Sequence, residues 1–397
     1  MRRNHQVIGG CAQVLILIAA TSCGDDKILS PPEPQTGWAA ITIETQGATI
    51  DRDGYVLAGF GDPAFPVGTS GTVVYVDVEP GQYQASLTGI AANCASDGGD
   101  TVALSVVAGD TTKHTFVITC RYAVRDEIVF DRDPFGGIDD IFVVGMDGSG
   151  LLNLSDSPDS SDGEPSISPD GTKIAFVSNR AGNNGDIYVM NADGSDLRQI
   201  TDDPSNEASP AWSPDGEYFA FASSAEGDWN IYVMRADGTE RRQLTFDPGA
   251  ENFPTWSPDG SQIAYDGTAE SGGFYGEIFI IDLAGGQPRN LTNSGAFDDN
   301  PAWSPSGEWI AFNSNRAGSD DIWLMHPDGS AATQVTSSPN NEGYPSWSPD
   351  GTKIVFSAIG IDTNGWDLFL VDLQTSQVSP LVAERSTDLF PQWSPLP

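Results

Sequence analysis

Short hydrophobic runs separated by Gly, Pro, Asp, Asn and Ser recur along almost the whole chain. Runs of this length, bounded by turn-forming residues, predict β-strands rather than helices. Between residues 37 and 121 the pattern predicts strands at 39–44, 55–58, 72–78, 82–87, 101–107 and 111–119. Six short strands in a segment of this size are typical of a small β-sandwich.

From residue 122 onward, four strand signals follow one another in a repeating order. The first carries Pro-x-Trp-Ser and leads into a Ser-Pro-Asp-Gly turn, where Pro presets φ and Gly ends a type I turn. The second strand is predicted at 128–130, 174–176, 219–221, 263–265, 310–312 and 354–356. The third begins with an acid or amide, as at 186–190 and 321–325, and the fourth is short, as at 197–201 and 241–245.

The spacing of the motif predicts the architecture. Successive motif serines lie 44 to 47 residues apart, at Ser168, Ser213, Ser257, Ser304, Ser348 and Ser394. Four strands per repeat at this period indicate a β-propeller. The first repeat lacks its first strand, and the chain ends on a first strand without followers, at residues 391–394. We therefore predict an all-β chain with a six-bladed propeller at 122–397, closed by its C-terminal strand, which removes exposed edges.

The repeat resembles a known family. Trp-Ser-Pro-Asp-Gly at 212–216, Ile-Ala-Phe-Val-Ser-Asn-Arg at 174–180 and Asp-Ile-Tyr-Val-Met-Asn-Ala-Asp-Gly at 186–194 are similar to TolB-type propeller repeats. The resemblance implies a propeller whose mouth receives a protein or peptide. TolB proteins carry an α/β domain before the propeller, whereas a β-sandwich is expected here. Within that segment, residues 78–87 resemble the Pro-Gly-x-Tyr hairpins of transthyretin-like and PEGA-type domains.

The beginning of the chain has the features of a bacterial export signal. Arg2 and Arg3 precede an apolar stretch at 7–20, which is too short for a stable membrane span. Small residues then precede Cys23, as in a lipobox, so we expect a signal peptide at 1–22, lipidation of Cys23 and a tether at 23–36. The alternative is ordinary cleavage that leaves a free thiol. The chain is thus expected to be an exported, membrane-anchored lipoprotein facing the periplasm or the cell exterior.

Charge and cysteine content narrow the partners further. The net charge is −38, which opposes binding to nucleic acid and leaves the lipid as the expected membrane contact. In an exported segment, Cys94 and Cys120 are an even pair and predict a disulfide.

One acidic position is present in all six repeats, three residues before the proline of the first strand. These six carboxylates, called the ring acids below, are Asp162, Glu207, Glu251, Asp298, Glu342 and Asp388. If the first strand is innermost, they crowd one mouth of the channel. They would bind a divalent cation or a basic partner, or they would be offset by local hydrogen bonds. The repeated Trp residues are expected as wedges between blades, with sugar stacking as the alternative.

Two further sets of residues are expected to act structurally. The acids that begin the third strands should tie down the preceding turn, with Arg180 and Arg316 as partners for such acids.

The sequence contains little that supports catalysis. Its three histidines, His5, His114 and His326, are dispersed, and no Gly-x-Ser-x-Gly elbow occurs. We expect no catalytic residue and no cofactor. The leading hypothesis is a non-catalytic, lipid-anchored envelope protein whose propeller binds a protein or peptide. The alternative is a carbohydrate-binding or carbohydrate-active propeller, since paired carboxylates can hydrolyse glycosides.

Overall fold

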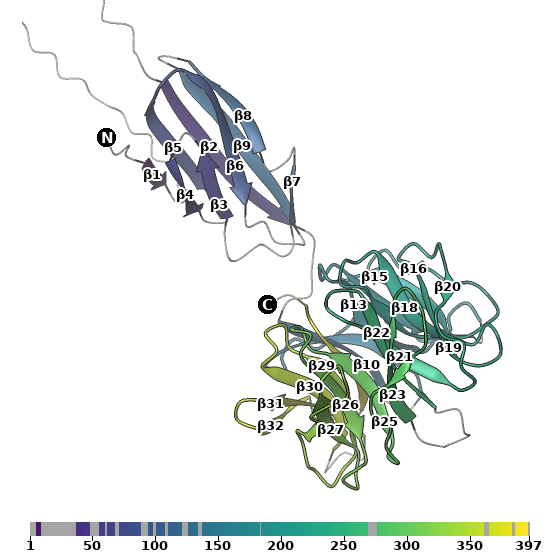
Figure 1. Ribbon diagram of the computed structural model, residues 1–397. Coiled ribbons are helices and arrows are strands. Elements are labelled where there is room, and N and C mark those ends of the chain that lie inside the picture. Colours follow the sequence, from purple (N-terminus) through teal and green to yellow (C-terminus); the bar gives the residue numbers. More distant parts are fainter. Residues whose placement is uncertain are drawn as a thin grey trace, which may run out of the picture. The chain divides into compact units, whose positions relative to one another are not determined.

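The computed structural model describes residues 5–8, 37–47, 55–59, 62–67, 71–88, 94–97, 101–107, 110–120, 126–133, 137–182, 184–268, 276–360, 365–382 and 386–395. The chain divides into two compact units, Met1–Tyr122 and Ala123–Pro397. The elements in the described ranges are all strands, numbered β1 to β33, and most of them are labelled in Figure 1. Across these ranges no helix has the length and hydrophobicity needed to cross a bilayer.

The first unit contains two sheets. The five-stranded sheet has the order β1-β5-β2-β9-β7, in which β2 and β9 are parallel, and the four-stranded sheet has the order β4-β3-β6-β8. The strands are β1 (His5–Ile8), β2 (Gly37–Gly47), β3 (Tyr55–Gly59), β4 (Asp62–Val67), β5 (Gly71–Val78), β6 (Gly81–Thr88), β7 (Cys94–Asp97), β8 (Thr101–Val106) and β9 (Thr111–Cys120).

Both sheets contribute to one hydrophobic core in this unit. Ile41 on β2 and Phe116 on β9 come from the larger sheet, and Leu57 on β3 and Leu87 on β6 come from the smaller one. The six predicted strands are all present, and three more are found. Of these, β4 contains two prolines and β7 is polar, and both lie at sheet edges, where such residues are tolerated and hydrophobic alternation is weak. Strand β1 falls within the predicted export signal.

The second unit consists of six four-stranded sheets, here called blades 1 to 6. Blade 1 is β13 (Asp162–Ile167), β14 (Lys173–Ser178), β15 (Asp186–Asn191) and β16 (Arg198–Gln199), and blade 2 is β17 (Glu207–Trp212), β18 (Tyr218–Ser223), β19 (Asn230–Arg235) and β20 (Arg242–Gln243). Blade 3 is β21 (Glu251–Trp256), β22 (Gln262–Thr268), β23 (Gly276–Asp282) and β24 (Arg289–Asn290), and blade 4 is β25 (Asp298–Trp303), β26 (Ile310–Ser314), β27 (Asp321–Met325) and β28 (Thr333–Gln334). Blade 5 is β29 (Glu342–Trp347), β30 (Lys353–Ile359), β31 (Trp366–Asp372) and β32 (Gln377–Val382).

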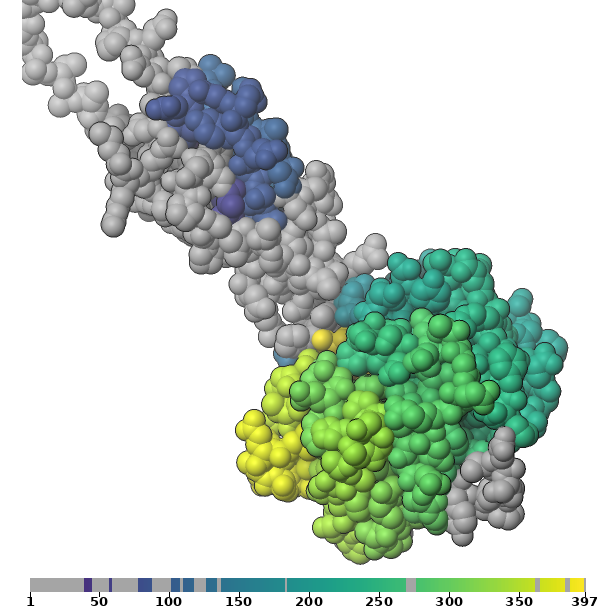
Figure 2. All heavy atoms as spheres, in the orientation of Figure 1, coloured from purple at the N-terminus to yellow at the C-terminus, as the bar shows by residue number. Residues whose placement is uncertain are grey.

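Blade 6 joins the two ends of the second unit. It contains β10 (Glu127–Asp133), β11 (Asp140–Gly145), β12 (Leu152–Asn153) and β33 (Thr387–Trp393). Strand β33 pairs antiparallel with β10, with Trp393 opposite Ile128 and Leu389 opposite Asp131. The offset of the repeat therefore predicted the pairing correctly. Colours run from teal through green to yellow around this unit in Figure 2, as expected for blades in chain order.

The repeated tryptophans lie between neighbouring blades. Trp256 is 7% exposed and packs against Ala222 and Ile231 of the preceding blade. Its indole Nε1 donates a hydrogen bond to the carbonyl of Ala211, also in the preceding blade, at 3.1 Å. Trp347 makes the same kind of contact with the carbonyl of Ala302 at 3.0 Å. These indoles are wedges that join successive blades, as the sequence predicted.

The Ser-Pro-Asp-Gly segment forms a closed turn in each blade that carries it. In blade 1 the Gly171 amide donates to the Ser168 carbonyl at 2.8 Å, and Gly171 has a φ of +67°. Asp170 accepts hydrogen bonds from the Ser168 hydroxyl and from the Thr172 amide. The polar groups of the motif therefore bond to one another within the turn, and the motif has a structural role.

The structure describes the backbone of the two cysteines for which a disulfide is predicted, but not the cysteine predicted to be lipidated. Cys94 on β7 and Cys120 on β9 lie directly opposite each other in an antiparallel pair. Their side chains, and all of Cys23 and the tether at 23–36, lie outside the described residues.

Candidate functional site

The ring acids are buried inside the propeller. Each lies at or near the start of the innermost strand of its blade, and their side chains are between 0% and 4% exposed. They are Asp162, Glu207, Glu251, Asp298, Glu342 and Asp388, each three residues before the proline of its strand. However, none of them is among the residues that line the central cavity described below. Their burial favours the structural alternative over an exposed channel mouth.

Four ring acids form ion pairs with arginine. Arg180 lies 2.6 Å from Asp162, and Arg316 lies 2.7 Å from Asp298. These two arginines thus pair with ring acids, and not with the acids of the third strands as the sequence suggested. In the other two blades the arginine comes from a different place in the chain. Arg241, just before β20, lies 3.2 Å from Glu207, and Arg132 on β10 lies 3.4 Å from Asp388.

The arginines also lie over aromatic rings of their own blades. The guanidinium of Arg316 lies 5.3 Å from the Phe312 ring centre and 5.0 Å from that of Trp323. Arg241 lies over Phe221 and Tyr232 in the same way, at 5.1 and 4.9 Å. Because a cation is attracted to the face of an aromatic ring, these contacts add to each ion pair.

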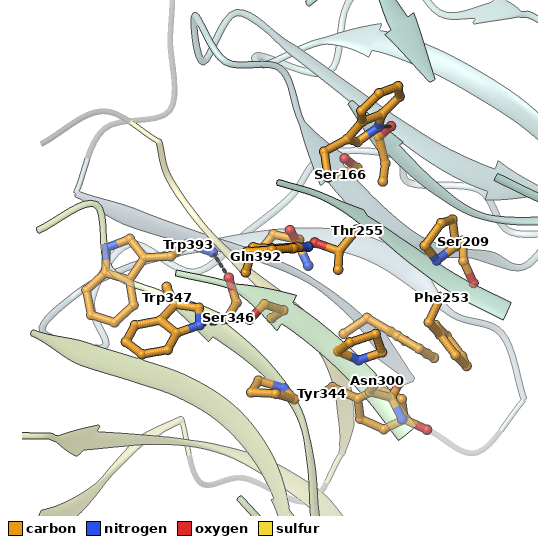
Figure 3. Close-up of a pocket in the computed structure, with 18 of the residues that line it drawn as sticks. Ser166, Ser209, Phe253, Thr255, Asn300, Tyr344, Ser346, Trp347, Gln392 and Trp393 are labelled. Atoms are coloured by element: carbon orange, nitrogen blue, oxygen red, sulfur yellow. Dashed lines mark hydrogen bonds between the residues drawn. The ribbon is translucent and has the colours of Figure 1, made fainter. Parts of the chain in front are cut away.

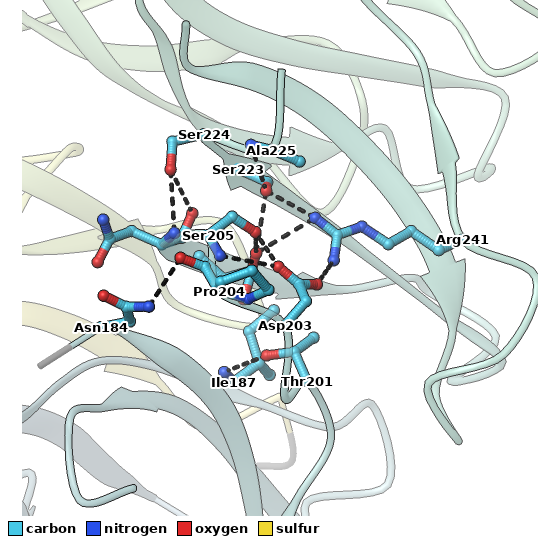
Figure 4. A network of polar contacts seen from close by, with 12 residues as sticks. Asn184, Ile187, Thr201, Asp203, Pro204, Ser205, Ser223, Ser224, Ala225 and Arg241 are labelled. Atoms are coloured by element: carbon cyan, nitrogen blue, oxygen red, sulfur yellow. Dashed lines mark hydrogen bonds and ion pairs between the residues drawn. The ribbon is translucent and has the colours of Figure 1, made fainter. Parts of the chain in front are cut away.

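Blade 2 shows the most extended of these networks. Arg241 contacts Asp203, the Ser223 hydroxyl and Glu207, and the Ser205 hydroxyl donates to both Asp203 and Glu207. Figure 4 shows Arg241 and Asp203 facing each other with Ser205 and Ser223 around them. Desolvation still raises the pKa of Glu207 above its usual value, despite its hydroxyl donors and Arg241.

Blades 3 and 5 stabilise their ring acids without an arginine. Glu251 accepts a hydrogen bond from the Thr245 hydroxyl, and Glu342 accepts one from the Thr336 hydroxyl. Among the described residues neither carboxylate has a basic partner within ion-pair distance. Burial therefore raises the pKa of Glu251 to about 7, and it raises the pKa of Glu342 as well.

The acids that begin the third strands bond forward in the chain. Asp140 accepts hydrogen bonds from Asn153, the Ser155 hydroxyl and the Ser157 amide. Glu277 likewise accepts from the Ser294 amide. Asn153 is the last residue of the fourth strand, and the other partners lie after that strand, in the loop that leads to the next blade. The prediction of a bond to the preceding turn was therefore wrong for Asp140 and Glu277, because the adjacent outer strand brings the later loop beside them. The amide at the same position in blade 2, Asn230, does bond back, to the Asp228 carbonyl at 3.0 Å.

A cavity of about 430 Å³ lies at the centre of the propeller. Residues of all six innermost strands line it, including Trp256, Trp303, Trp347 and Trp393. Figure 3 shows Phe253, Asn300 and Tyr344 grouped together, with Trp347 and Trp393 on another side. A concave site of this size, with apolar walls and a few polar groups, suits a small ligand or a short segment of a polypeptide.

Each innermost strand contributes one residue with left-handed backbone to this cavity. These residues immediately precede the repeated prolines, and their φ angles lie between +49° and +57°. They are Glu164, Ser209, Phe253, Asn300, Tyr344 and Phe390. The strand register shifts at this point, as between Gly163 and Ser166 in blade 1. Non-glycine residues in this conformation are held there by the surrounding fold and are often found at binding sites.

Sequence reasoning did not select these six positions as a site. The signal was present, because the residue before the proline changes from blade to blade inside an otherwise uniform repeat. The fold determines the residues around this position but not the residue at the position itself, which can therefore be selected for contact with a ligand.

Three of these residues form an aromatic cluster across the channel. The rings of Phe253 and Phe390 are stacked, with centres 5.7 Å apart, although they belong to opposite blades 3 and 6. Tyr344 lies 4.3 Å from Phe390 and 6.2 Å from Phe253. These contacts bring three rings of the cavity lining together across the channel, and this cluster is called the aromatic floor below.

Four carboxylates, called the floor acids below, lie near enough to Tyr344 to act on it electrostatically. Asp131 accepts a hydrogen bond from the Glu164 amide at 3.0 Å, and Glu164 accepts from the Ser209 hydroxyl at 3.2 Å. The other two floor acids are Asp266 and Asp299, and Asp299 accepts from the Asn313 side chain.

The floor acids are poorly solvated. Burial raises the pKa of Asp131 and Asp266 well above the usual value, and it raises the pKa of Asp299 to about 6. Desolvation and then the floor acids raise the pKa of Tyr344 to about 12. Four carboxylates therefore act on one ring of the floor.

No group of three or more His, Cys, Asp or Glu side chains suited to hold a metal ion occurs in the part of the chain that the structure describes. The ring acids are instead engaged by arginine or by hydroxyl groups, as described above. The divalent cation considered at the channel mouth therefore has no assembled ligand set among these residues.

Two known families of β-propeller domains match the repeats. The family described as the TolB β-propeller domain matches residues 268–396, and the N-terminal β-propeller domain of tricorn protease matches residues 184–275. The second unit is a TolB-like β-propeller. A search of the curated proteins finds no match for the chain.

Solved structures support the same fold for the TolB-like propeller. TolB from Acinetobacter baumannii matches with 24% identity and a TM-score of 0.59, covering 68% of this chain and 66% of that protein. TolB from Agrobacterium tumefaciens matches with 24% identity and a TM-score of 0.54, covering 68% of this chain and 95% of that one. Hydrazine synthase from Kuenenia stuttgartiensis matches with 16% identity and a TM-score of 0.57, covering 69% of this chain and 48% of that one.

Proposed function

We propose that this protein is a non-catalytic scaffold of the bacterial envelope whose TolB-like propeller binds a segment of a partner protein in its central cavity. The observation that carries this proposal is the cavity of about 430 Å³ lined by one left-handed residue from each of six blades. Six differing side chains on an otherwise uniform scaffold give a surface that is specific without disturbing the fold. The resemblance to TolB propellers supports the same function.

The composition of the cavity favours binding over glycoside hydrolysis. Hydrolysis needs two carboxyl groups facing one sugar linkage. Among the described residues that line the cavity, only Glu164 carries a carboxylate. The floor acids Asp131, Asp266 and Asp299 are not part of that lining. The lining instead combines aromatic rings, prolines, hydroxyls and amides, which suit a polypeptide segment.

Export and anchoring through Cys23 remain part of the proposal. We expect the mature protein to begin at Cys23 and to fractionate with membranes, and we expect Cys23→Ser to release it. Mass spectrometry of the mature N-terminus together with membrane fractionation measures both. A mature chain without lipid would leave the propeller function intact and remove the anchor from the proposal.

Blocking the cavity tests the binding function. Thr255 lines the cavity, so Thr255→Trp should fill part of it, whereas Thr239 lies in an exposed turn and Thr239→Trp is the matched control. Both variants are used as bait in an envelope extract beside the unmodified protein. We expect a defined protein to be captured by the unmodified chain and by Thr239→Trp, and to be lost with Thr255→Trp. Equal capture by all three baits would contradict binding in the cavity.

A further inference from the structure

The floor acids lack the positive partners that four of the ring acids have. Ring acids Asp162 and Asp298 each contact an arginine at less than 3 Å. In contrast, no ion pair joins any floor acid to a basic side chain within the described ranges. The fold therefore supplies arginine to four of the six ring acids and to none of the floor acids, as far as the described residues go. A desolvated carboxylate is best stabilised by an opposite charge nearby.

The wall of the cavity also presents hydrogen-bond acceptors without donors. Glu164 uses its Oε2 to accept from the amide and hydroxyl of Ser209. Its Oε1 accepts no hydrogen bond from the described residues. The buried Oδ1 of Asn300, which also lines the cavity, likewise has no donor in this part of the chain. A ligand that carries N–H donors would satisfy both atoms.

The aromatic floor also suits a ligand with a positively charged N–H group. The faces of aromatic rings carry partial negative charge and attract ammonium and guanidinium groups. Phe253, Tyr344 and Phe390 meet at the floor, within about one ring width of one another. Rings, an acid on the wall and an unpaired amide oxygen thus converge on one small volume. The chain as a whole carries a net charge of −38, which draws cations toward it.

We propose that the cavity binds a basic side chain, lysine or arginine, of the partner polypeptide, with its charged group between Glu164, Asn300 and the aromatic floor. This inference rests on the proposed protein-binding function and names the chemistry that the partner must present. The stem of a lysine or arginine is apolar and matches the proline and tryptophan walls, while its head supplies the N–H donors. The charge of the ligand replaces the arginine that the floor acids lack.

Short peptides test the proposal directly on the full-length protein. The probes are acetylated, amidated pentapeptides of alanine with a central lysine, acetyl-lysine or glutamate. Four tryptophans line the cavity, so intrinsic fluorescence and titration calorimetry report binding. We expect the lysine peptide to bind at least about tenfold more tightly than the acetyl-lysine peptide, because a charge-assisted contact is lost. We expect the glutamate peptide not to bind.

Two variants locate the site. Glu164→Gln keeps the acceptor toward Ser209 but removes the charge, and it should weaken the lysine peptide at least about tenfold. Phe390→Leu keeps an apolar floor without a ring and should also weaken it. The control is Glu308→Gln, which removes the same charge from an exposed position and should leave affinity unchanged. Circular dichroism establishes that each variant is folded.

The outcomes separate this inference from the function on which it rests. Equal binding of the lysine, acetyl-lysine and glutamate peptides would overturn the inference and leave peptide binding standing. If free n-butylamine binds as tightly as the lysine peptide, the cavity is an amine site and the commitment to a polypeptide falls. Absence of lysine-peptide binding up to millimolar concentration, or retention of full affinity in folded Glu164→Gln, also overturns the inference.

Discussion

Glu251 and Asp298 occupy the same repeat position, yet removing their charges should change stability in opposite directions. Asp298 is fully buried and is held by Arg316 at 2.7 Å and by the Ser294 hydroxyl at 2.6 Å. Asp298→Asn leaves the guanidinium without its partner, and loss of one member of a buried pair costs about 3 kcal/mol or more. Glu251 has no arginine partner among the described residues; it accepts a hydrogen bond from the Thr245 hydroxyl, and Gln keeps an acceptor for that hydroxyl.

The sign for Glu251 follows from proton linkage. Burial raises its pKa from 4.5 in the unfolded chain to about 7 in the folded protein. The folded state therefore binds more protons than the unfolded state between these values, so the contribution of Glu251 to stability falls as pH rises through this window. The full difference corresponds to about 3 kcal/mol. Glutamine does not titrate and does not suffer this loss.

We therefore expect the free energy of unfolding of Glu251→Gln, taken relative to that of the unmodified protein, to rise by about 2 kcal/mol when the pH is raised from 5 to 8. Asp298→Asn should destabilise the protein at pH 8. Urea unfolding followed by tryptophan fluorescence measures both, because nine of the ten tryptophans lie after residue 122 and report the propeller.

The reasoning is refuted if Glu251→Gln destabilises the protein at pH 8 as strongly as Asp298→Asn does. That result would mean that Glu251 is charged in the folded state and has a favourable partner. A gain that is equal at pH 5 and pH 8 would also contradict it, because it would not arise from titration of Glu251.

Three further changes test the architecture. Trp256→Ala removes a wedge and its hydrogen bond to the Ala211 carbonyl, so it should cost about 3–5 kcal/mol in urea unfolding, and a cost below about 1 kcal/mol would exclude the wedge role. Deleting residues 387–397 removes the strand paired with β10, and we expect a lower melting temperature and a larger apparent mass in light scattering, whereas an unchanged monomer would contradict closure through that strand. Cys94 and Cys120 lie opposite each other in adjacent strands, so thiol labelling of the exported, unfolded protein should find both protected until a reductant is added, and two reactive thiols before reduction would exclude the disulfide.

Much of the fold follows from local chemistry that the sequence displays. The period of the repeat, the Ser-Pro-Asp-Gly turns and the position of each second strand depend on interactions between residues close together in the chain. The hydrogen bonds from Ser168 and Thr172 to Asp170 are examples. Even the pairing of the first blade with the last strand could be predicted, because each blade needs four strands and the chain supplies them with an offset.

The edge strands of the first unit were harder to predict. Strand β4 includes Pro63 and Pro66, and prolines normally argue against a strand. Its position at the edge of a sheet makes them acceptable, since the outer side of such a strand needs no partner. Whether a segment lies at an edge depends on how the sheet assembles, and no local pattern states it.

The sequence by itself determined that six blades would form and that each would carry one acid before its proline. Only the tertiary structure decided that these acids are buried and that four of them receive arginines from three different places in the repeat. It decided as well that, among the described residues, no arginine pairs with Glu251 or Glu342. It also brought together Phe253, Tyr344 and Phe390, which are far apart in the chain, at one cavity floor. The physical reason is that turns and strand pairs are local, whereas a cavity on the propeller axis exists only after all six blades have packed around it.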